Sequence, residues 1–228
     1  MRPDDGHLDD GDGGERAGRD DVAVCVVPLP GLQSLLMAAG LVRQLAAAYP
    51  VLLVADVEHE RTLRRMFGCV RDVRFWFTRE HAEERARALG LRVMVLRDDP
   101  MASYSAAGLE ISHMHDAWWR DEERERRVLE RVVDMVGNTF VVVQGRVGRS
   151  WLPEGVPTVP VDAIPFDDPL DVCGVLESAA QVHAPDGWLL TLADIVGGRS
   201  SKYCHAYASE APLAACRRKY RRRVRMIT

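Results

Sequence analysis

The stretch VAVCVVPLPGLQSLLMAAGLVRQLAAAY, residues 22–49, decides the fold class of this chain. Its first six residues form a Val-rich apolar run, which is typical of a strand buried on both faces. Pro28 and Gly31 then mark a turn, and the Leu and Ala residues after it recur at helical spacing. A strand, a short loop and a helix in this order predict a parallel sheet covered by helices.

The same alternation continues along the chain. Strands are expected over residues 51–54, 70–77 and 91–96, and helices over 58–67 and 80–89. A long helix is expected over 116–136, charged in its first half and apolar in its second. The pattern restarts with strands at 140–143, 158–161 and 181–184 and helices at 169–180 and 187–196. The sequence therefore predicts an α/β protein of two small Rossmann-like halves that face each other across a cleft.

The two ends of the chain differ in charge from its body. The first 21 residues carry eight Asp and Glu against three Arg, whereas residues 217–225 include seven basic side chains. An acidic, Gly-rich segment without apolar periodicity is typical of disorder. We expect an acidic leader over 1–20, a first half over 21–136, a second half over 137–208 and a basic tail over 209–228.

Composition limits the cellular setting and the cofactors. The chain has 228 residues, of which 47% are apolar and 28% charged, as in ordinary globular proteins. Its five cysteines show neither a disulfide framework nor a CxxC metal motif. No apolar run is long enough to cross a membrane, and no signal peptide precedes the fold. We expect a cytoplasmic protein with no membrane span, no metal and no cofactor.

Four strings carry a resemblance to a known family. They are PGLQS with AGLVR (30–34, 39–43), YSAAGL with MHDAW (104–109, 114–118), LESAAQVHAPD (176–186) and KYCHAYA (202–208). In order and spacing, the chain resembles the GT-B-type glycosyltransferase-like proteins of large DNA viruses and some bacteria. The resemblance implies a compact GT-B architecture and a nucleotide-sugar donor in the interdomain cleft. A viral origin would place the protein in the host cytoplasm or the virion.

The resemblance also implies a binding site for the donor. Its second half would supply Gln144 and Arg146 from a loop after a strand, Glu177 for the ribose, and Asp186 and Gly187 before a helix whose N-terminus receives phosphate. The remaining positions that it implies are Gly31 in the first half and His183 in the second.

Departures from the family pattern concern catalysis. The family's GLGD loop reads GLQS here, so Gln33 replaces a glycine and Ser34 replaces the acidic candidate for the general base. A serine hydroxyl without assistance cannot act as a general base. Gly187 and Trp188 stand where the family has two serines. The catalytic residue is therefore open, with Ser34 and Asp116 as candidates, and the chain is either a glycosyltransferase or a catalytically degenerate relative.

Other interpretations remain for the same residues. His183 also fits a hydrogen-bonded histidine of the core, and Glu177 fits a solvated helix residue. The cluster of His113, His115 and Asp116 lacks a further ligand at metal-site spacing. A non-catalytic structural or binding module is one alternative function. Nucleic-acid binding is another, through the basic residues Arg217, Arg218, Lys219, Arg221, Arg222, Arg223 and Arg225.

Overall fold

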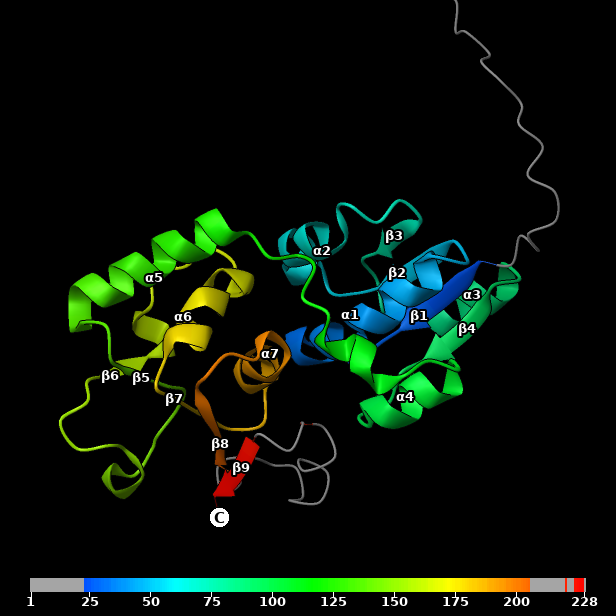
Figure 1. Ribbon diagram of the computed structural model, residues 1–228. Helices are drawn as coiled ribbons and strands as arrows, with labels where there is room; N and C mark the ends of the chain where they lie inside the picture. The colour runs from blue at the N-terminus through cyan, green and yellow to red at the C-terminus, as the bar shows by residue number, and fades with distance from the viewer. Residues whose placement is uncertain (1–22, 206–219, 221–223, 228) are drawn as a thin grey trace, which may run out of the picture.

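The protein is described by a computed structural model for residues 23–205, 220 and 224–227, and it consists of two parallel sheets surrounded by helices (Figure 1). The first sheet has the strand order β3-β2-β1-β4, and the second has the order β6-β5-β7-β8-β9. Every strand pair in both sheets is parallel. The predicted α/β fold with two Rossmann-like halves is confirmed.

The first half begins with the unit that the sequence predicted. Its strands are β1 (Val24–Val27), β2 (Val51–Val54), β3 (Val73–Trp76) and β4 (Arg92–Val95), and its helices are α1 (Leu32–Ala46), α2 (Glu60–Phe67), α3 (Ala82–Ala88) and α4 (Pro100–Ala106). Helix α1 packs on the sheet face that contains Val24 and Val26, whereas α3 packs with Cys25 on the opposite face. Because both faces are covered at the centre of the sheet, β1 and β2 are apolar without alternation, whereas the edge strands β3 and β4 each contain an exposed arginine.

The second half repeats this design. It contains β5 (Val141–Val143), β6 (Thr158–Pro160), β7 (Gln181–Ala184), β8 (Ser201–His205) and β9 (Val224–Ile227), with the helices α5 (Glu122–Val136), α6 (Cys173–Ser178) and α7 (Trp188–Val196). Helix α5 packs on α6 and on the 3₁₀ turn η5 (Pro169–Val172). The expected first half ended at residue 136 and so included α5. In the structure α5 packs against the second half, whereas the chain from β1 to α4 packs in the first.

Three local features differ from the expectations. The expected long helix begins at Glu122 with Asp121 as its N-cap, because residues 111–115 form a separate 3₁₀ turn, η2 (Ile111–His115). Helix α4 was not expected. Within the expected basic tail, residues 224–227 form strand β9, which was not expected and which pairs with β8 at the edge of the second sheet.

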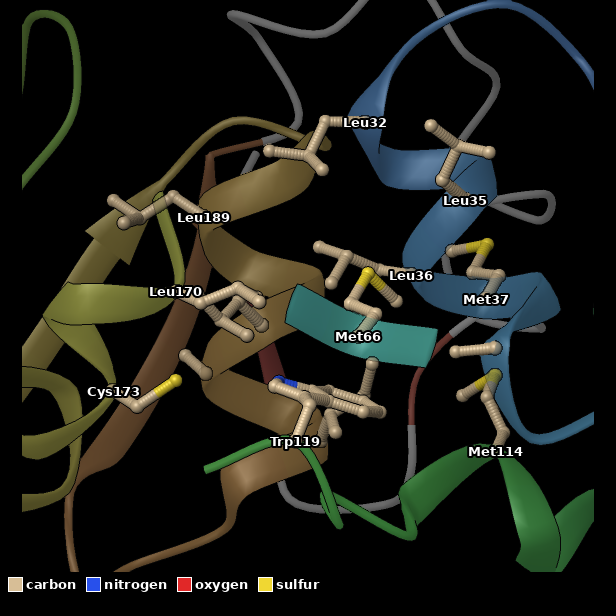
Figure 2. Packing of buried hydrophobic residues seen from close by; sticks show 14 of the residues in the cluster. Leu32, Leu35, Leu36, Met37, Met66, Met114, Trp119, Leu170, Cys173 and Leu189 are labelled. Atoms are coloured by element: carbon tan, nitrogen blue, oxygen red, sulfur yellow. The ribbon is translucent and has the colours of Figure 1, made fainter. Parts of the chain in front are cut away.

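The two halves share one apolar core. Helices α1 and α7 pack against each other, and buried side chains from both halves belong to the same cluster. Figure 2 shows Leu36 of α1 and Met66 of α2 beside α7, with Leu170 of the second half on the other side of this helix and Trp119 near Met66. An apolar interface of this kind favours one fixed arrangement of the two halves.

Ion pairs surround this apolar contact. Arg65 of α2, only 12% exposed at its side chain, lies between three carboxylates of the second half: Glu125 at 3.7 Å, Asp168 at 3.9 Å and Asp171 in direct contact. Arg120 binds Glu125 through its Nε atom, at 2.9 and 2.7 Å from the two carboxylate oxygens. The second half therefore fixes α2 through charge as well as through packing.

A close approach at Gly40 attaches η2 to α1. A Cβ atom at this position would lie 1.9 Å from the carbonyl oxygen of His113 and 2.8 Å from the Tyr104 hydroxyl. That hydroxyl accepts a hydrogen bond from the Leu41 amide at 2.9 Å and donates one to the Met37 carbonyl at 3.1 Å. Glycine is therefore needed here for space rather than for an unusual backbone angle.

Candidate functional site

The N-termini of α1 and α7 meet where the two halves join. Gln33 in the first turn of α1 donates from Nε2 to Oδ1 of Asp186, 2.6 Å away, just before α7 begins. Strands β1 and β7 end immediately before these helices, so the carboxyl ends of two parallel sheets converge here. This is the position at which α/β proteins bind their ligands.

The loop before α1 is shaped by one glycine and one arginine. Gly31 is the N-cap residue and has a φ of 93°, a conformation that side-chain-bearing residues rarely adopt. Arg79 donates to the carbonyl of Pro28 at 2.7 Å and to Asp56 at 2.6 Å. The predicted turn at Gly31 is thus present, and Arg79, from the loop after β3, holds the backbone before it in place.

The loop before α7 contains Asp186 and Gly187, two of the residues expected to bind the nucleotide-sugar. Gly187 has an extended backbone with φ 175°, and a Cβ atom there would meet nothing nearer than the Pro185 carbonyl oxygen at 4.0 Å. Tyr220 donates its hydroxyl proton to Asp186 and accepts from Gln33 at 3.2 Å. Burial, together with the negative charge of Asp186, raises the pKa of Tyr220 well above its usual range. One oxygen of Asp186, Oδ1, therefore accepts hydrogen bonds from both Gln33 and Tyr220.

The loop after β5 lies at the same edge of the second sheet, since β5 is the parallel neighbour of β7. The backbone N–H of Gln144 donates to the His183 carbonyl at 2.8 Å. Its side-chain Oε1 atom is buried and has no hydrogen-bond partner in the described part of the chain. Arg146 follows on the exposed surface of this loop. Both residues therefore lie in a loop that follows a strand, and a role for them in binding stays a prediction.

His183 lies in the core, and this position does not fit the expected contact with a nucleotide-sugar. The ring is fully buried on β7, stacks on Tyr203 with the centroids 4.5 Å apart, and donates from Nε2 to Gln181 Oε1 at 2.8 Å. Its Nδ1 atom then accepts from His205 Nε2 at 2.9 Å. Burial, with the neighbouring His205, lowers the pKa of His183 to about 4. The alternative of a neutral core histidine is the one that the geometry supports.

Glu177 is not brought together with Asp186. It lies at the end of α6, where its backbone contacts Gly198, and therefore at the edge where β7 and β8 begin. Both carboxylate oxygens accept from Arg120, at 3.0 and 2.8 Å. Glu177, followed by Glu125, raises the pKa of this guanidinium. The position and the ion pair explain Glu177 structurally and separate it from the loops that follow the strands.

The two catalytic candidates lie apart from each other. Ser34 lines a small pocket between the ends of β1 and β4, together with Arg97, Asp98 and Ser103. Asp116 instead pairs with Nδ1 of His113 at 3.5 Å in the segment after η2. The carboxylate that shares the Ser34 pocket is therefore Asp98, which the sequence analysis did not consider. Its place directly after a strand, at the ligand-binding edge, was the signal available in the sequence.

The histidine cluster is separated in space. His115 turns toward α7, where its Nε2 atom lies 3.2 Å from Asp194, while His113 lies beside Gln44 and Asp116. In the described residues, the group with metal-ligand spacing is instead Asp56, Glu58 and His59. Arg79 already neutralises Asp56 in this group, which disfavours a cation.

The remaining predictions about partners concern the tail and the membrane. Of the seven basic residues, Arg225 lies in β9 with its guanidinium 5.9 Å from the Tyr203 ring, and the other six lie outside the described residues. Nucleic-acid binding stays a prediction. Among the helices that the structure describes, none has both the length and the apolar character needed to span a bilayer.

Comparisons with known proteins support the fold and nothing finer. No protein-family profile matches the sequence, and no curated protein matches it. Among solved structures, the chain is similar to the ADP-heptose LPS heptosyltransferase II of E. coli, with a TM-score of 0.52, 11% identity, and 90% of each chain covered. It is also similar to a family 9 glycosyl transferase of Veillonella parvula, with a TM-score of 0.51, 9% identity, and 91% and 87% of the two chains covered. The chain therefore has a GT-B-like glycosyltransferase fold.

Proposed function

We propose that the chain binds a nucleotide-sugar through its diphosphate at the paired N-termini of α1 and α7. The observation that carries this proposal is the contact between Gln33 and Asp186, which places two helix N-termini side by side where two parallel sheets end. Helix N-termini present free backbone N–H groups and a partial positive charge, and these favour phosphate. The solved structures with the same fold are transferases, one of them named for a nucleotide-sugar, ADP-heptose.

Two residues of the loop after β5 complete the proposed site. The buried Oε1 atom of Gln144 is an acceptor without a protein partner in the described residues, so it can accept a hydrogen bond from a ribose hydroxyl or from an N–H group of a base. Arg146 follows two residues later and can form a charged hydrogen bond with a phosphate. We therefore propose Gln144, Arg146, Asp186 and Gly187, with Gly31 across the cleft, as the donor site.

We further propose that sugar transfer is slow or absent. Ser34 stands at the position where the resembling family has an acid, and a hydroxyl is a poor base at neutral pH. Asp98 shares the pocket of Ser34 and is the carboxylate that can replace the missing base. On the donor side, the negative charge of Asp186 lies where a diphosphate would bind, and it is already satisfied by Gln33 and Tyr220. Phosphate binding would have to replace those hydrogen bonds.

A non-catalytic binding module is the second candidate function, and the interface between the halves favours it. The shared apolar core and the buried Arg65 favour a fixed arrangement of the halves. An enzyme that must open to exchange substrates would need to expose this core.

We also propose the cellular setting and the wider kinship from the sequence. The cysteines of the described residues, Cys25, Cys69, Cys173 and Cys204, are all free thiols, which is consistent with a reducing, cytoplasm-like compartment. The four sequence strings support divergent membership of the glycosyltransferase-like proteins of large DNA viruses and some bacteria.

The first test is a thermal-shift panel of nucleoside diphosphates and nucleotide-sugars. A ligand at 100 times its Kd stabilises the folded state by about 2.7 kcal/mol, so even weak donors are detected at millimolar concentration. Donor hydrolysis and transfer to mixed sugar acceptors are then measured for the wild type, Ser34→Ala and Asp98→Asn. We expect a shift with at least one nucleotide and very low turnover that Asp98→Asn abolishes. Fast turnover unaffected by both substitutions would place the base elsewhere.

A further inference from the structure

A cavity of about 440 Å³ lies on the outer face of the second half, away from the cleft mouth. Three arginines of α5 line it at helical spacing, Arg124, Arg127 and Arg131, and Pro165 and Phe166 form its apolar part. The volume lies within the range of small-molecule sites. No residue of the donor site proposed above lines this cavity.

The charges around this arginine cavity do not cancel. Its two carboxylates are Asp167 and Asp171. Asp171 is buried and already receives two guanidinium groups, that of Arg65 from behind and that of Arg124 at 3.2 Å. Asp167 is 79% exposed at its side chain and has Arg61 at 3.9 Å. The acidic groups are therefore compensated by cations beyond those that face the cavity.

Two of the three arginines are available for a ligand. Arg131 makes no ion pair or hydrogen bond with any residue that the structure describes. Arg127 is 57% exposed, and its Nε atom is 3.6 Å from the Glu123 carboxylate, a distance typical of a weak surface pair. The same Nε atom donates a long hydrogen bond, 3.3 Å, to the Glu123 carbonyl oxygen, which leaves the terminal nitrogens of Arg127 for a ligand. By contrast, Arg126 on the outward face of the same helix pairs closely with both Glu123 and Glu130. Among the described residues, the arginine of α5 without a side-chain partner, Arg131, and the weakly paired Arg127 both line the cavity.

From this arrangement we infer that the arginine cavity binds a multiply phosphorylated small molecule. Guanidinium groups bind phosphate oxygens in a bidentate manner, and Arg127 and Arg131, one turn apart on the same helix face, can contact separate phosphates. Phe166 and Val128 provide an apolar surface for the ring that bears those phosphates. This inference does not depend on the function proposed for the cleft.

Calorimetric titration of the full chain with inositol hexakisphosphate tests the inference. The wild type should bind the probe, with an affinity that falls as salt is raised. Arg131→Gln should weaken binding about tenfold, because one charged hydrogen-bond donor is lost. Arg126→Gln removes the same charge from the same helix outside the cavity and should change the affinity less than about twofold, since an exposed charge outside the site contributes little.

Three results would overturn the inference. They are no binding by the wild type, equal weakening by Arg131→Gln and Arg126→Gln, and weakening by Arg146→Gln instead, which would place the probe in the cleft. A urea unfolding curve for each variant confirms that the chain is folded. Because the probe carries no nucleoside, failure here leaves the nucleotide proposal to its own test.

Discussion

Replacing Gly40 by alanine tests the close packing of η2 against α1. The new methyl group would lie 1.9 Å from the His113 carbonyl oxygen, 2.5 Å from its carbon and 2.8 Å from the Tyr104 hydroxyl. The first of these distances is about 1.5 Å short of van der Waals contact, and two of the three atoms are backbone atoms that cannot rotate away. The substitution must therefore separate η2 from α1.

The expected cost follows from three contributions. Overpacking a core costs about 1–3 kcal/mol, and displacing the buried Tyr104 hydroxyl costs about 1–3 kcal/mol more. Alanine in place of glycine returns about 1 kcal/mol of helix propensity. We expect the free energy of unfolding to fall by about 2–4 kcal/mol for Gly40→Ala. For Tyr104→Phe, which creates no clash, we expect a fall of about 1 kcal/mol.

Urea unfolding followed by circular dichroism measures both variants. Helix propensity alone predicts that Gly40→Ala is more stable than the wild type, so the two explanations differ in sign. A Gly40→Ala chain as stable as the wild type, or more so, would refute the close approach of η2.

Two further predictions concern the interface and the core. Glu125→Ala should cost about 3–5 kcal/mol in urea unfolding because it removes the buried carboxylate that Arg65 and Arg120 share. Glu177→Ala, at a partly exposed side chain, should cost about 1 kcal/mol or less, and equal losses would contradict the central place of Glu125. Below pH 6.5 an unfolded histidine gains a proton that buried His183 does not accept until about pH 4, so the free energy of unfolding should fall across this window by at most about 1.4 kcal/mol per pH unit. The slope between pH 6.5 and 5 should decrease in His183→Gln, and an unchanged slope would argue against the buried neutral pair.

The sequence predicted the elements whose periodicity is strong. Residues 51–54 and 181–184 are strands with the expected bounds, and the helix expected after Gly31 is α1 (Leu32–Ala46). Strand β9 was missed because Val224 and Met226 alternate with arginines in a basic run, where charge obscures a four-residue strand. Pairing with β8 stabilises this segment as a strand, although its local sequence has little strand propensity.

Only those site residues that directly follow a strand could be predicted from the sequence. Asp186, Gly187 and Gln144 follow strands, so parallel pairing brings their loops to one edge. His183 could not be assigned from sequence, because β7 is buried on both faces and its alternation does not separate core from cleft. The ion pair between Glu177 and Arg120 joins residues far apart in the chain, so no local sequence pattern predicts it.

The most direct test of the central claim is calorimetric titration with the nucleoside diphosphate that gives the largest thermal shift. Gly187→Ala should fold normally, since its Cβ atom meets no neighbour closer than 4.0 Å, but its methyl group lies at the start of α7. Together with Arg146→Gln, it should weaken binding by about 1–3 kcal/mol per variant, while Arg87→Gln on the exposed face of α3 should not. Unchanged affinity in Gly187→Ala and Arg146→Gln, with binding intact in the wild type, would contradict a donor site at the paired N-termini of α1 and α7.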